Sequence, residues 1–187
     1  MTRHHAFETA HGFAAIAWRG ERITGLRLPS SSAAEAERAL RRRFPDSAPA
    51  EPPPHVAEAI GTIRRYFTGK PVEFADLPLD LGEQDALFTR IYAEVRALRW
   101  GESTTYGAIA RAIGARPEAA RDVGQAMANN PIPLIVPCHR VLAAGGRIGG
   151  FSAPGGSHAK ARMLELEGVA FARDEPARPS PQTSFGF

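Results

Sequence analysis

A cysteine and a histidine stand side by side in this 187-residue sequence, in the stretch IVPCHR at residues 135–140. Cys138 is the only cysteine of the chain, and Pro133 and Pro137 flank the apolar segment before it. Prolines restrict the backbone on both sides, so the thiol is expected on a rigid turn. At such a turn Cys138 and His139 can face one site, and an imidazole near a thiol favours the reactive thiolate. The pair predicts a nucleophile and its base.

Other interpretations of the cysteine stay open at this point. A solitary cysteine is often a small buried apolar residue without a chemical role. A carboxylate, either Glu165 or Glu167, could also orient the histidine, which would make a Cys-His-carboxylate hydrolase. We expect no metal site, because Cys138, His139 and the distant His158 lack the paired spacing of zinc ligands.

Glycines are frequent in the segment that follows the cysteine. Glycine has no side chain and permits tight turns, so this loop can bring its backbone close to a flat ligand. These glycines stand at positions 145, 146, 149, 150, 155 and 156.

Three short helices are expected ahead of the cysteine. The apolar side chains of the first recur at helical spacing and are Phe88, Ile91, Val95 and Leu98. The second and third are predicted at residues 105–113 and 117–128, with Gly114 in the turn between them. Two short helices across such a turn are typical of a helix-turn-helix, although they could also simply pack in a core.

The third of these helices has mostly small side chains on its surface. Only Arg121, Asp122 and Gln125 are long enough to reach outward. A helix that reads bases in the major groove carries several long polar side chains, so sequence-specific readout is not expected. Small residues let the backbone approach a groove closely, with Arg121 as a probe or wedge, as in sequence-tolerant minor-groove binding.

The first part of the chain predicts a separate αβ unit. A hairpin is expected over residues 13–28 with its turn at Arg19–Glu21, followed by helices at 33–44 and 56–67. Residues 72–81 are expected to be a strand or an extended linker.

Domain boundaries follow from these elements. We place the N-terminal domain at residues 1–82 and a second domain at 83–170. Within the second domain we expect strands at 134–136 and 147–150, and a last helix between Ser157 and Gly168. Residues 171–187 lack periodicity and are expected to form a disordered tail.

Composition is compatible with a soluble protein. The net charge is +3, from 23 Lys and Arg against 20 Asp and Glu, which suits a polyanionic partner. No apolar run is long enough to cross a membrane, so no membrane association is expected. A single cysteine excludes an internal disulfide and fits a cytoplasmic location.

The motifs together resemble one known family. PCHR, preceded by NPIPLIV and followed by VLAAGGRIGGFSAPGG, is similar to the active-site signature of the O6-alkylguanine-DNA alkyltransferases, or methylated-DNA–protein-cysteine methyltransferases. The resemblance extends through TTYGAIA, PEAARDVGQAMANNP and KARMLELEG, and covers roughly residues 85–168. It implies an α+β protein, with an N-terminal ribonuclease H-like αβ domain and a C-terminal winged helix-turn-helix domain.

The resemblance also implies a reaction without a cofactor. A cysteine thiolate takes the alkyl group from guanine O6 in double-stranded DNA, with thymine O4 as a second candidate position. The protein is consumed, one molecule per lesion, and acts as a monomer.

Residue roles implied by the resemblance concern three groups of side chains. The catalytic group comprises Cys138 as acceptor, His139 as base through a water, Glu167 orienting His139, Asn130 organising the turn, and Tyr106 hydrogen-bonding guanine N3. The substrate-binding group comprises Ser152 on O6, the Val141 backbone near the exocyclic amine, Phe151 and Gly149. The DNA-binding group comprises Arg121, which fills the space of the extruded nucleotide, together with Ala120, Gln125 and Met127.

Two departures from the family pattern bear on substrate range and DNA contact. Phe151 stands where many members have tyrosine, and Ala128 replaces a basic residue found in some members. Two other functions remain in view: a module that binds alkylated guanine without repairing it, and the Cys-His-Glu hydrolase.

Overall fold

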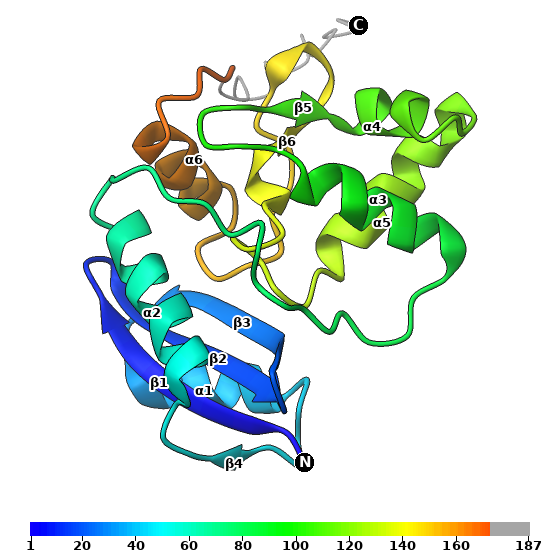
Figure 1. Ribbon diagram of the computed structural model, residues 1–187. Helices are drawn as coiled ribbons and strands as arrows, with labels where there is room; N and C mark the ends of the chain where they lie inside the picture. Colours follow the sequence, from blue (N-terminus) through cyan, green and yellow to red (C-terminus); the bar gives the residue numbers. More distant parts are fainter. Residues whose placement is uncertain (173–187) are drawn as a thin grey trace, which may run out of the picture.

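The computed structural model describes residues 1–172, and a four-stranded sheet forms its N-terminal part (Figure 1). The strands are β1 (Arg3–Thr9), β2 (Gly12–Arg19), β3 (Arg22–Ser30) and β4 (Ala48–Pro49), in the order β3-β2-β1-β4. Neighbours are antiparallel except for the short parallel pair of β1 and β4. The predicted hairpin is confirmed as β2 and β3, and β1 was not predicted.

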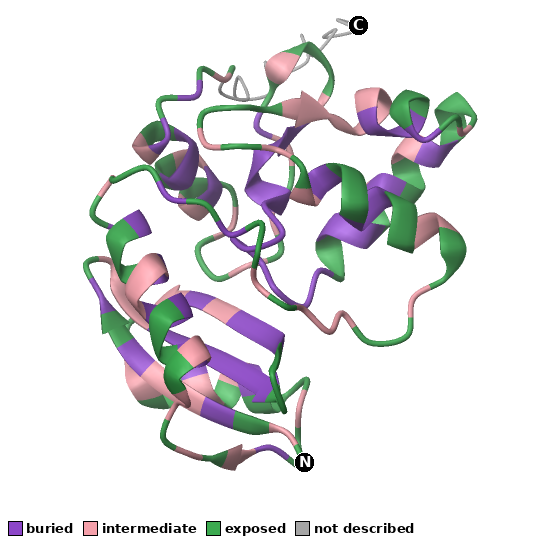
Figure 2. Cartoon of the chain, viewed as in Figure 1, coloured by how far each residue is buried: buried purple, intermediate pink, exposed green. Residues whose placement is uncertain are grey.

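Each face of the sheet is covered by one helix because β2 alternates its side chains. Ala15 and Ala17 point to α1 (Ala33–Arg41), where their small size lets the helix approach the sheet closely. Ile16 and Trp18 point to the opposite face, against α2 (Pro54–Tyr66). Both helices were predicted. The first was expected to end at residue 44 and ends at Arg41, and the second was expected to end at residue 67 and ends at Tyr66. Buried residues accordingly concentrate on β2 and β3 (Figure 2).

A long extended connection leads from α2 to the second half of the chain. It pairs with the sheet at one point, where Ile23 and Asp80 are joined by a backbone hydrogen bond of 2.8 Å. Residues 72–81 form no named strand, because a turn at 75–77 interrupts them and only Leu79 bridges to β3. The next helix begins after Asp85, whose carboxylate accepts a hydrogen bond from the backbone N–H of Phe88.

The second half consists of short helices around a two-stranded parallel sheet. The helices are α3 (Ala86–Arg96), α4 (Tyr106–Ala112), α5 (Ala120–Ala128) and α6 (Gly156–Leu166). A 3₁₀ turn (Pro117–Ala119) precedes α5, and the strands are β5 (Thr104–Thr105) and β6 (Val141–Leu142). The three helices predicted ahead of the cysteine and the last helix are thus confirmed. The structure is an α+β fold, as expected.

Two strand predictions in this half are wrong. Residues 134–136 form a tight turn in which Leu134 has a left-handed φ of 75°, and Val136 donates to the carbonyl of Ile132. Because Pro133 and Pro137 have no N–H, they cannot extend a ladder here. Residues 147–150 make only one isolated bridge, between Arg147 and Ala172.

The first two residues of the predicted disordered tail, Phe171 and Ala172, are in contact with the rest of the protein. Ala172 is paired with Arg147, and Phe171 packs against a small cluster that includes Leu164 and Val169. The rest of that prediction falls on residues 173–187, which lie outside the described residues.

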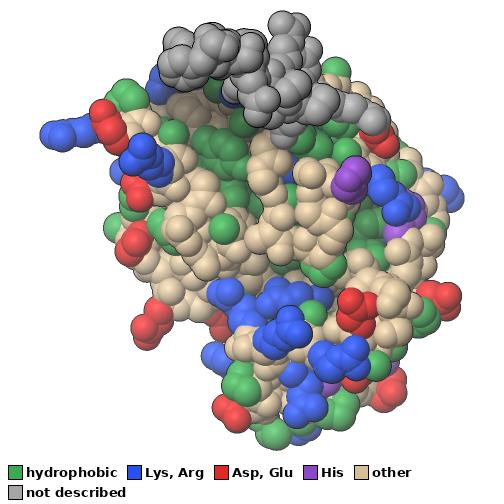
Figure 3. All heavy atoms as spheres, turned by 180° about the vertical axis from the view of Figure 1, so that it is seen from behind, with side chains coloured by type: hydrophobic (Ala, Val, Ile, Leu, Met, Phe, Trp, Pro, Cys, Tyr) green, Lys and Arg blue, Asp and Glu red, His purple; other side chains and the backbone are tan. Residues whose placement is uncertain are grey.

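The two halves share one apolar core. Ile132, Leu134, Ile135 and Met163 pack with the sheet and α2. A backbone hydrogen bond of 3.0 Å from Leu26 to Pro131 ties β3 to the turn ahead of the cysteine. The turn that carries the candidate nucleophile is therefore clamped between the two halves. On the face opposite to that of Figure 1, Lys and Arg side chains gather across the lower middle of the molecule (Figure 3).

Candidate active site

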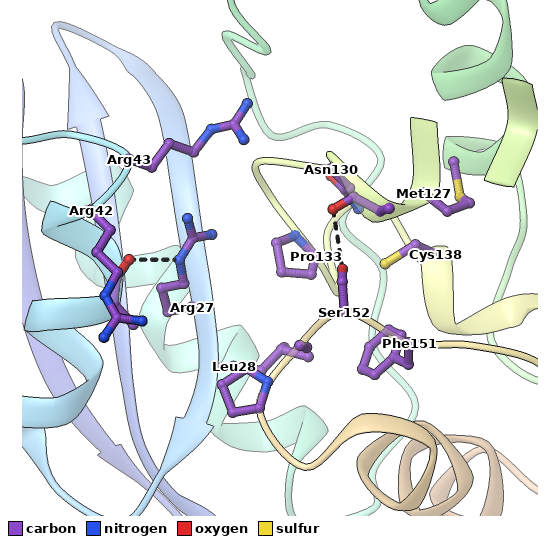
Figure 4. A pocket seen from close by; sticks show the side chains of 14 residues that line it. Arg27, Leu28, Arg42, Arg43, Met127, Asn130, Pro133, Cys138, Phe151 and Ser152 are labelled. Carbon is purple, nitrogen blue, oxygen red and sulfur yellow. Dashed lines mark hydrogen bonds between the residues drawn. The ribbon is translucent and has the colours of Figure 1, made fainter. Parts of the chain in front are cut away.

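Cys138 lies at the bottom of two cavities that meet at its side chain. It begins a 3₁₀ turn, η2 (Cys138–Arg140), directly after Pro137, and is 5% exposed. One cavity has a volume of about 310 Å³ and the other about 610 Å³, and Cys138 lines both. Figure 4 shows its sulfur pointing into the larger one. The thiol is thus packed by the protein but accessible from open space.

Asn130 fixes the turn that leads to the cysteine. Its side-chain amide donates to the carbonyl of Val136 at 2.8 Å, and its oxygen accepts from the N–H of Ile132 at 3.0 Å. Both bonds span the turn, which has few backbone hydrogen bonds of its own. The Asn130 side chain is also within hydrogen-bond reach of the Cys138 thiol. Asn130 therefore holds the turn ahead of Cys138 in shape.

His139 and Glu167 form a fully buried pair. The imidazole Nε2 and the carboxylate Oε1 are 2.6 Å apart, and both side chains have no exposed surface. Glu167 immediately follows α6, while Glu165 on the same helix is exposed. The choice of Glu167 as the partner of His139 agrees with this geometry.

Three further groups hold the Glu167 carboxylate, and none of them was predicted as its hydrogen-bond partner. Arg140 donates to both oxygens, from Nε at 2.8 Å and from Nη2 at 3.1 Å. The Tyr66 hydroxyl, at the end of α2, donates to Oε1 at 2.8 Å, and the N–H of Gly101 lies 3.4 Å from Oε2. Tyr66 occupies an ordinary core position of an amphipathic helix, so no sequence signal distinguished it.

The electrostatics of the three reactive groups follow from their burial. Burial raises the pKa of the Cys138 thiol, although Asn130 and the charge of Lys160 act in the opposite direction. Burial lowers the pKa of His139, because it too favours the neutral form, whereas the hydrogen bond and the charge of Glu167 act to raise it. Burial would raise the pKa of Glu167, but the hydrogen bonds and charges of His139 and Arg140 outweigh it and lower the pKa to about 2.

The resting site therefore holds a neutral thiol, a neutral imidazole and a carboxylate paired with a guanidinium. An adjacent imidazole favours the thiolate, but the desolvation of the sulfur acts in the opposite direction and raises its pKa. His139 Nδ1 is buried and has no hydrogen-bond partner among the described residues. One ring nitrogen is thus fixed by Glu167 and the other is available to accept a proton.

The smaller cavity, called the slot below, is lined by two aromatic residues. Tyr106 and Phe151 line it together with Gly124, Gly150 and Ser152. The two glycines leave the walls without side chains at these points, which suits a flat ligand. Met127, Ala128 and Cys138 complete the lining.

Lys160 supports the walls of this slot from behind. Its side chain is fully buried, and its ammonium group donates to the carbonyl of Val141 at 2.7 Å and approaches that of Gly150 at 3.5 Å. The same ammonium lies 5.9 Å from the centre of the Tyr106 ring. Lys160 was not predicted as a site residue.

Of the four predicted substrate-binding residues, Phe151 and Ser152 line the slot, whereas Val141 and Gly149 do not. Ser152 lines both cavities, and its hydroxyl donates to the carbonyl of Ala128 at 3.1 Å, which ties the loop to the end of α5. Gly149 has a left-handed φ of 66°, and a Cβ built there would lie 3.7 Å from the Tyr106 ring. Val141 is buried, and its carbonyl is engaged by Lys160.

The predicted DNA-binding residues divide into two groups. Arg121 and Gln125 are exposed on α5, and Ala120 is half-buried at its start. Met127 is buried, at 7% exposure, and lines both cavities. It faces inward because it falls on the same side of α5 as the core residue Val123, and it is placed to contact a ligand in the slot.

Two kinds of feature are absent from residues 1–172. No group of three or more His, Cys, Asp and Glu side chains could hold a metal ion there. In the same residues no helix has the length and apolar character needed to cross a membrane.

Comparisons with known proteins converge on one family. The domain described as "6-O-methylguanine DNA methyltransferase, DNA binding domain" matches residues 86–169. A "Methylated-DNA--protein-cysteine methyltransferase" of Mycobacterium tuberculosis is 35% identical over 167 residues, which are 89% of this chain and 93% of that protein. One from Metallosphaera sedula is 47% identical over 106 residues, 57% of this chain and 64% of its own length.

Solved structures extend this likeness to the fold. The crystal structure of the M. tuberculosis enzyme in complex with DNA has a TM-score of 0.71 and is 35% identical, covering 88% of this chain and 92% of that chain.

Proposed function

The chain belongs to the methylated-DNA–protein-cysteine methyltransferases, and we propose that Cys138 is the residue that accepts the alkyl group. The protein repairs DNA by direct reversal, without excising the damaged base. The assignment of Cys138 depends on one observation, the buried pair of His139 and Glu167 that directly adjoins it. His139 and Glu167 are fully buried and 2.6 Å apart, and Cys138, the residue before His139, lines both cavities.

In the proposed reaction, proton transfer accompanies the attack. His139 Nδ1 takes the thiol proton through a bridging water, and Glu167 stabilises the imidazolium that forms. The sulfur then forms a bond to the alkyl carbon while the bond from that carbon to guanine O6 breaks. Tyr106 hydrogen-bonds N3 of the leaving guanine as it gathers negative charge. The guanine anion takes up one proton, which balances the proton that the thiol gave to His139. The products are S-alkylcysteine and restored guanine, and the stable thioether ends the activity of that molecule.

The slot lined by Tyr106 and Phe151 is the proposed site of the damaged base. A guanine stacked in a duplex cannot present its O6 substituent to a buried sulfur, so the nucleotide must rotate out of the helix. Ser152 would hydrogen-bond O6, with the Val141 backbone and Gly149 close to the base. Since the Val141 carbonyl already accepts from Lys160, its second lone pair remains for the exocyclic amine.

DNA is the partner of this protein, and α5 is the element that we propose to contact it. The exposed Arg121 and Gln125 face outward from this helix, and its C-terminal end borders the slot. Arg121 would occupy the space that the rotated nucleotide leaves. The few long polar side chains on α5 favour binding to many sequences.

The domain organisation that we propose follows the family. Residues 1–82 would form a ribonuclease H-like αβ domain and residues 83–170 a winged helix-turn-helix domain in which α4 and α5 are the two helices. We further propose that the protein acts as a monomer in the cytoplasm, on double-stranded DNA that carries alkylated guanine.

The alkyl-transfer experiment uses a duplex with one O6-methylguanine. After incubation, intact-mass measurement is expected to show one added methyl group, located on Cys138 by peptide mapping, with saturation at one equivalent. Many turnovers per protein molecule would refute the proposal and point to the hydrolase. Tight binding with an unmodified cysteine would instead indicate a module that only binds the lesion.

A further inference from the structure

The larger of the two cavities has no part in the function described so far. It shares Met127, Ala128, Cys138, Phe151 and Ser152 with the base slot, so the two spaces are continuous at the sulfur. Beyond these shared residues it extends away from α5, past Pro133 and Leu28, to the sheet of the N-terminal half (Figure 4). A ligand held at Cys138 could therefore reach into both.

The geometry of the reaction assigns different parts of the substrate to the two cavities. In a displacement at saturated carbon, the attacking sulfur and the leaving oxygen lie on opposite sides of that carbon. Any further atoms of the alkyl group point sideways from this line. With the guanine in the narrow slot, the remaining space at Cys138 is the larger cavity, whose volume of about 610 Å³ exceeds what a methyl group needs.

The far wall of this cavity is strongly positive. It is formed by Arg27 of β3 and by Arg42 and Arg43, which directly follow α1, and no Asp or Glu lines the cavity. Figure 4 shows the guanidinium groups of Arg27 and Arg43 turned toward the gap that Cys138 faces. The cavity thus has the nucleophile on one side and cations on the other.

These charges are not neutralised by neighbouring carboxylates. Arg27 donates to the backbone carbonyls of Ala39 and Leu26, at 3.2 and 3.0 Å, which fix its position without cancelling its charge. No ion pair within residues 1–172 involves Arg27, Arg42 or Arg43. Burial and the nearby charge of Arg43 lower the pKa of Arg27, so an anion between them would relieve this repulsion.

We propose that the larger cavity receives the alkyl group and that Arg27, Arg42 and Arg43 make the protein favour extended O6 substituents that end in an anionic group. The substrate class is a guanine whose O6 substituent carries a terminal carboxylate several bonds from the reacting carbon. This inference rests on the proposed alkyl transfer to Cys138. Guanidinium groups suit such a substituent because they form charge-assisted hydrogen bonds with carboxylates.

Free bases test this proposal without any contribution from DNA phosphates. The probes are O6-benzylguanine and two derivatives with a 4-carboxymethyl or a 4-aminomethyl group on the benzyl ring. The second-order rate of Cys138 alkylation is measured by intact mass. The full-length wild-type protein is expected to react about three- to fivefold faster with the carboxylate than with the amine. Added salt should reduce this ratio.

The variant Arg42→Gln/Arg43→Gln is expected to bring the ratio close to one. Its matched control is Arg38→Gln/Arg41→Gln, which removes the same charge from exposed positions of α1 that do not line the cavity. The control should keep the wild-type ratio. Both pairs are exposed, so neither depends on replacing the more buried Arg27.

Three outcomes would overturn the inference. One is a wild-type ratio of one, and another is an equal fall of the ratio in variant and control. The third is an unchanged ratio together with weaker binding of duplex DNA by Arg42→Gln/Arg43→Gln, which would assign these arginines to DNA phosphates. If the wild-type protein reacts with none of the probes and with no methylated duplex, the alkyl transfer itself fails, a result distinct from these three.

Discussion

The Tyr66 hydroxyl donates a hydrogen bond of 2.8 Å to Glu167 Oε1, although 101 residues separate them in the sequence. The same hydroxyl lies 3.4 Å from Nε2 of His139. Tyr66 ends α2, so the N-terminal half supplies one of the groups that hold the proposed base. This half therefore contributes to the site itself as well as to the core.

Replacing Tyr66 with phenylalanine is expected to change how alkyl transfer depends on pH. Glu167 Oε1 loses one of its three side-chain donors, so the carboxylate attracts the imidazolium more strongly and the pKa of His139 rises. His139 is then protonated at a higher pH, and the rate begins to fall at a higher pH as the solution is acidified. Looser positioning of Glu167 should also slow transfer at neutral pH by about tenfold. Single-turnover rates between pH 5 and pH 8 measure both effects.

Tyr92→Phe is the matched control for this change. Tyr92 is also a buried tyrosine, but its hydroxyl donates to the backbone carbonyl of Ala126 at 2.8 Å. It should lose stability without a displaced pH profile. A profile that moves equally in both variants would show that Tyr66 acts only through packing.

Arg140→Met is expected to destabilise the fold strongly. The substitution leaves the Glu167 carboxylate buried without its cationic partner, which costs about 3–5 kcal/mol in comparable cases. Urea unfolding at pH 7 measures the loss, and Arg116→Met, at an exposed position, should change stability little. Adding Glu167→Gln to Arg140→Met should recover part of the loss, since the unpaired charge is removed. Additive losses would contradict the pairing.

Cys138→Ala should abolish alkyl transfer while affinity for methylated duplex DNA persists. The substitution removes the sulfur but leaves the slot and the surface of α5 in place. Fluorescence anisotropy with lesion and lesion-free duplexes measures binding, and intact mass confirms the absence of transfer. A complete loss of binding would mean that the thiol, or the alkylated product, holds the DNA.

Arg121→Ala should slow repair of a methylated duplex more than reaction with free O6-benzylguanine. Only the duplex requires the nucleotide to leave the stack, and Arg121 is exposed on α5, where it can fill the vacated space. Gln125→Ala, on the same face, provides a comparison for the general loss of DNA contact. Equal losses on the duplex and the free base would remove Arg121 from this role.

Local patterns predicted much of the fold. The stripe of Phe88, Ile91 and Val95 identified α3, because one face of that helix is buried and the other is not. The strand predicted at 134–136 was wrong for a physical reason. An apolar run beside prolines can be buried as a turn held by a side chain, here Asn130, and no periodicity distinguishes the two cases.

Site residues could be predicted where they are adjacent in the sequence or belong to a family motif. Cys138 and His139 are adjacent, and Glu167 followed from the family pattern, so these three could be named. Tyr66 and Lys160 could not, because each reads as an ordinary helix residue until distant segments meet. The direction of the thiol's pKa shift could not be predicted from the sequence either, since it depends on burial that only the packed fold creates.

Glu167 comes after Tyr66, Gly101, His139 and Arg140 in chain order, and it is the group on which all four converge. A ribosome makes the chain from its N-terminus, so every other member of the network is synthesised before the carboxylate. Until α6 and the residue after it emerge, the nascent protein has Cys138 and His139 but not the carboxylate that holds the imidazole. The network around His139 can therefore close only after nearly all of the described chain has been made.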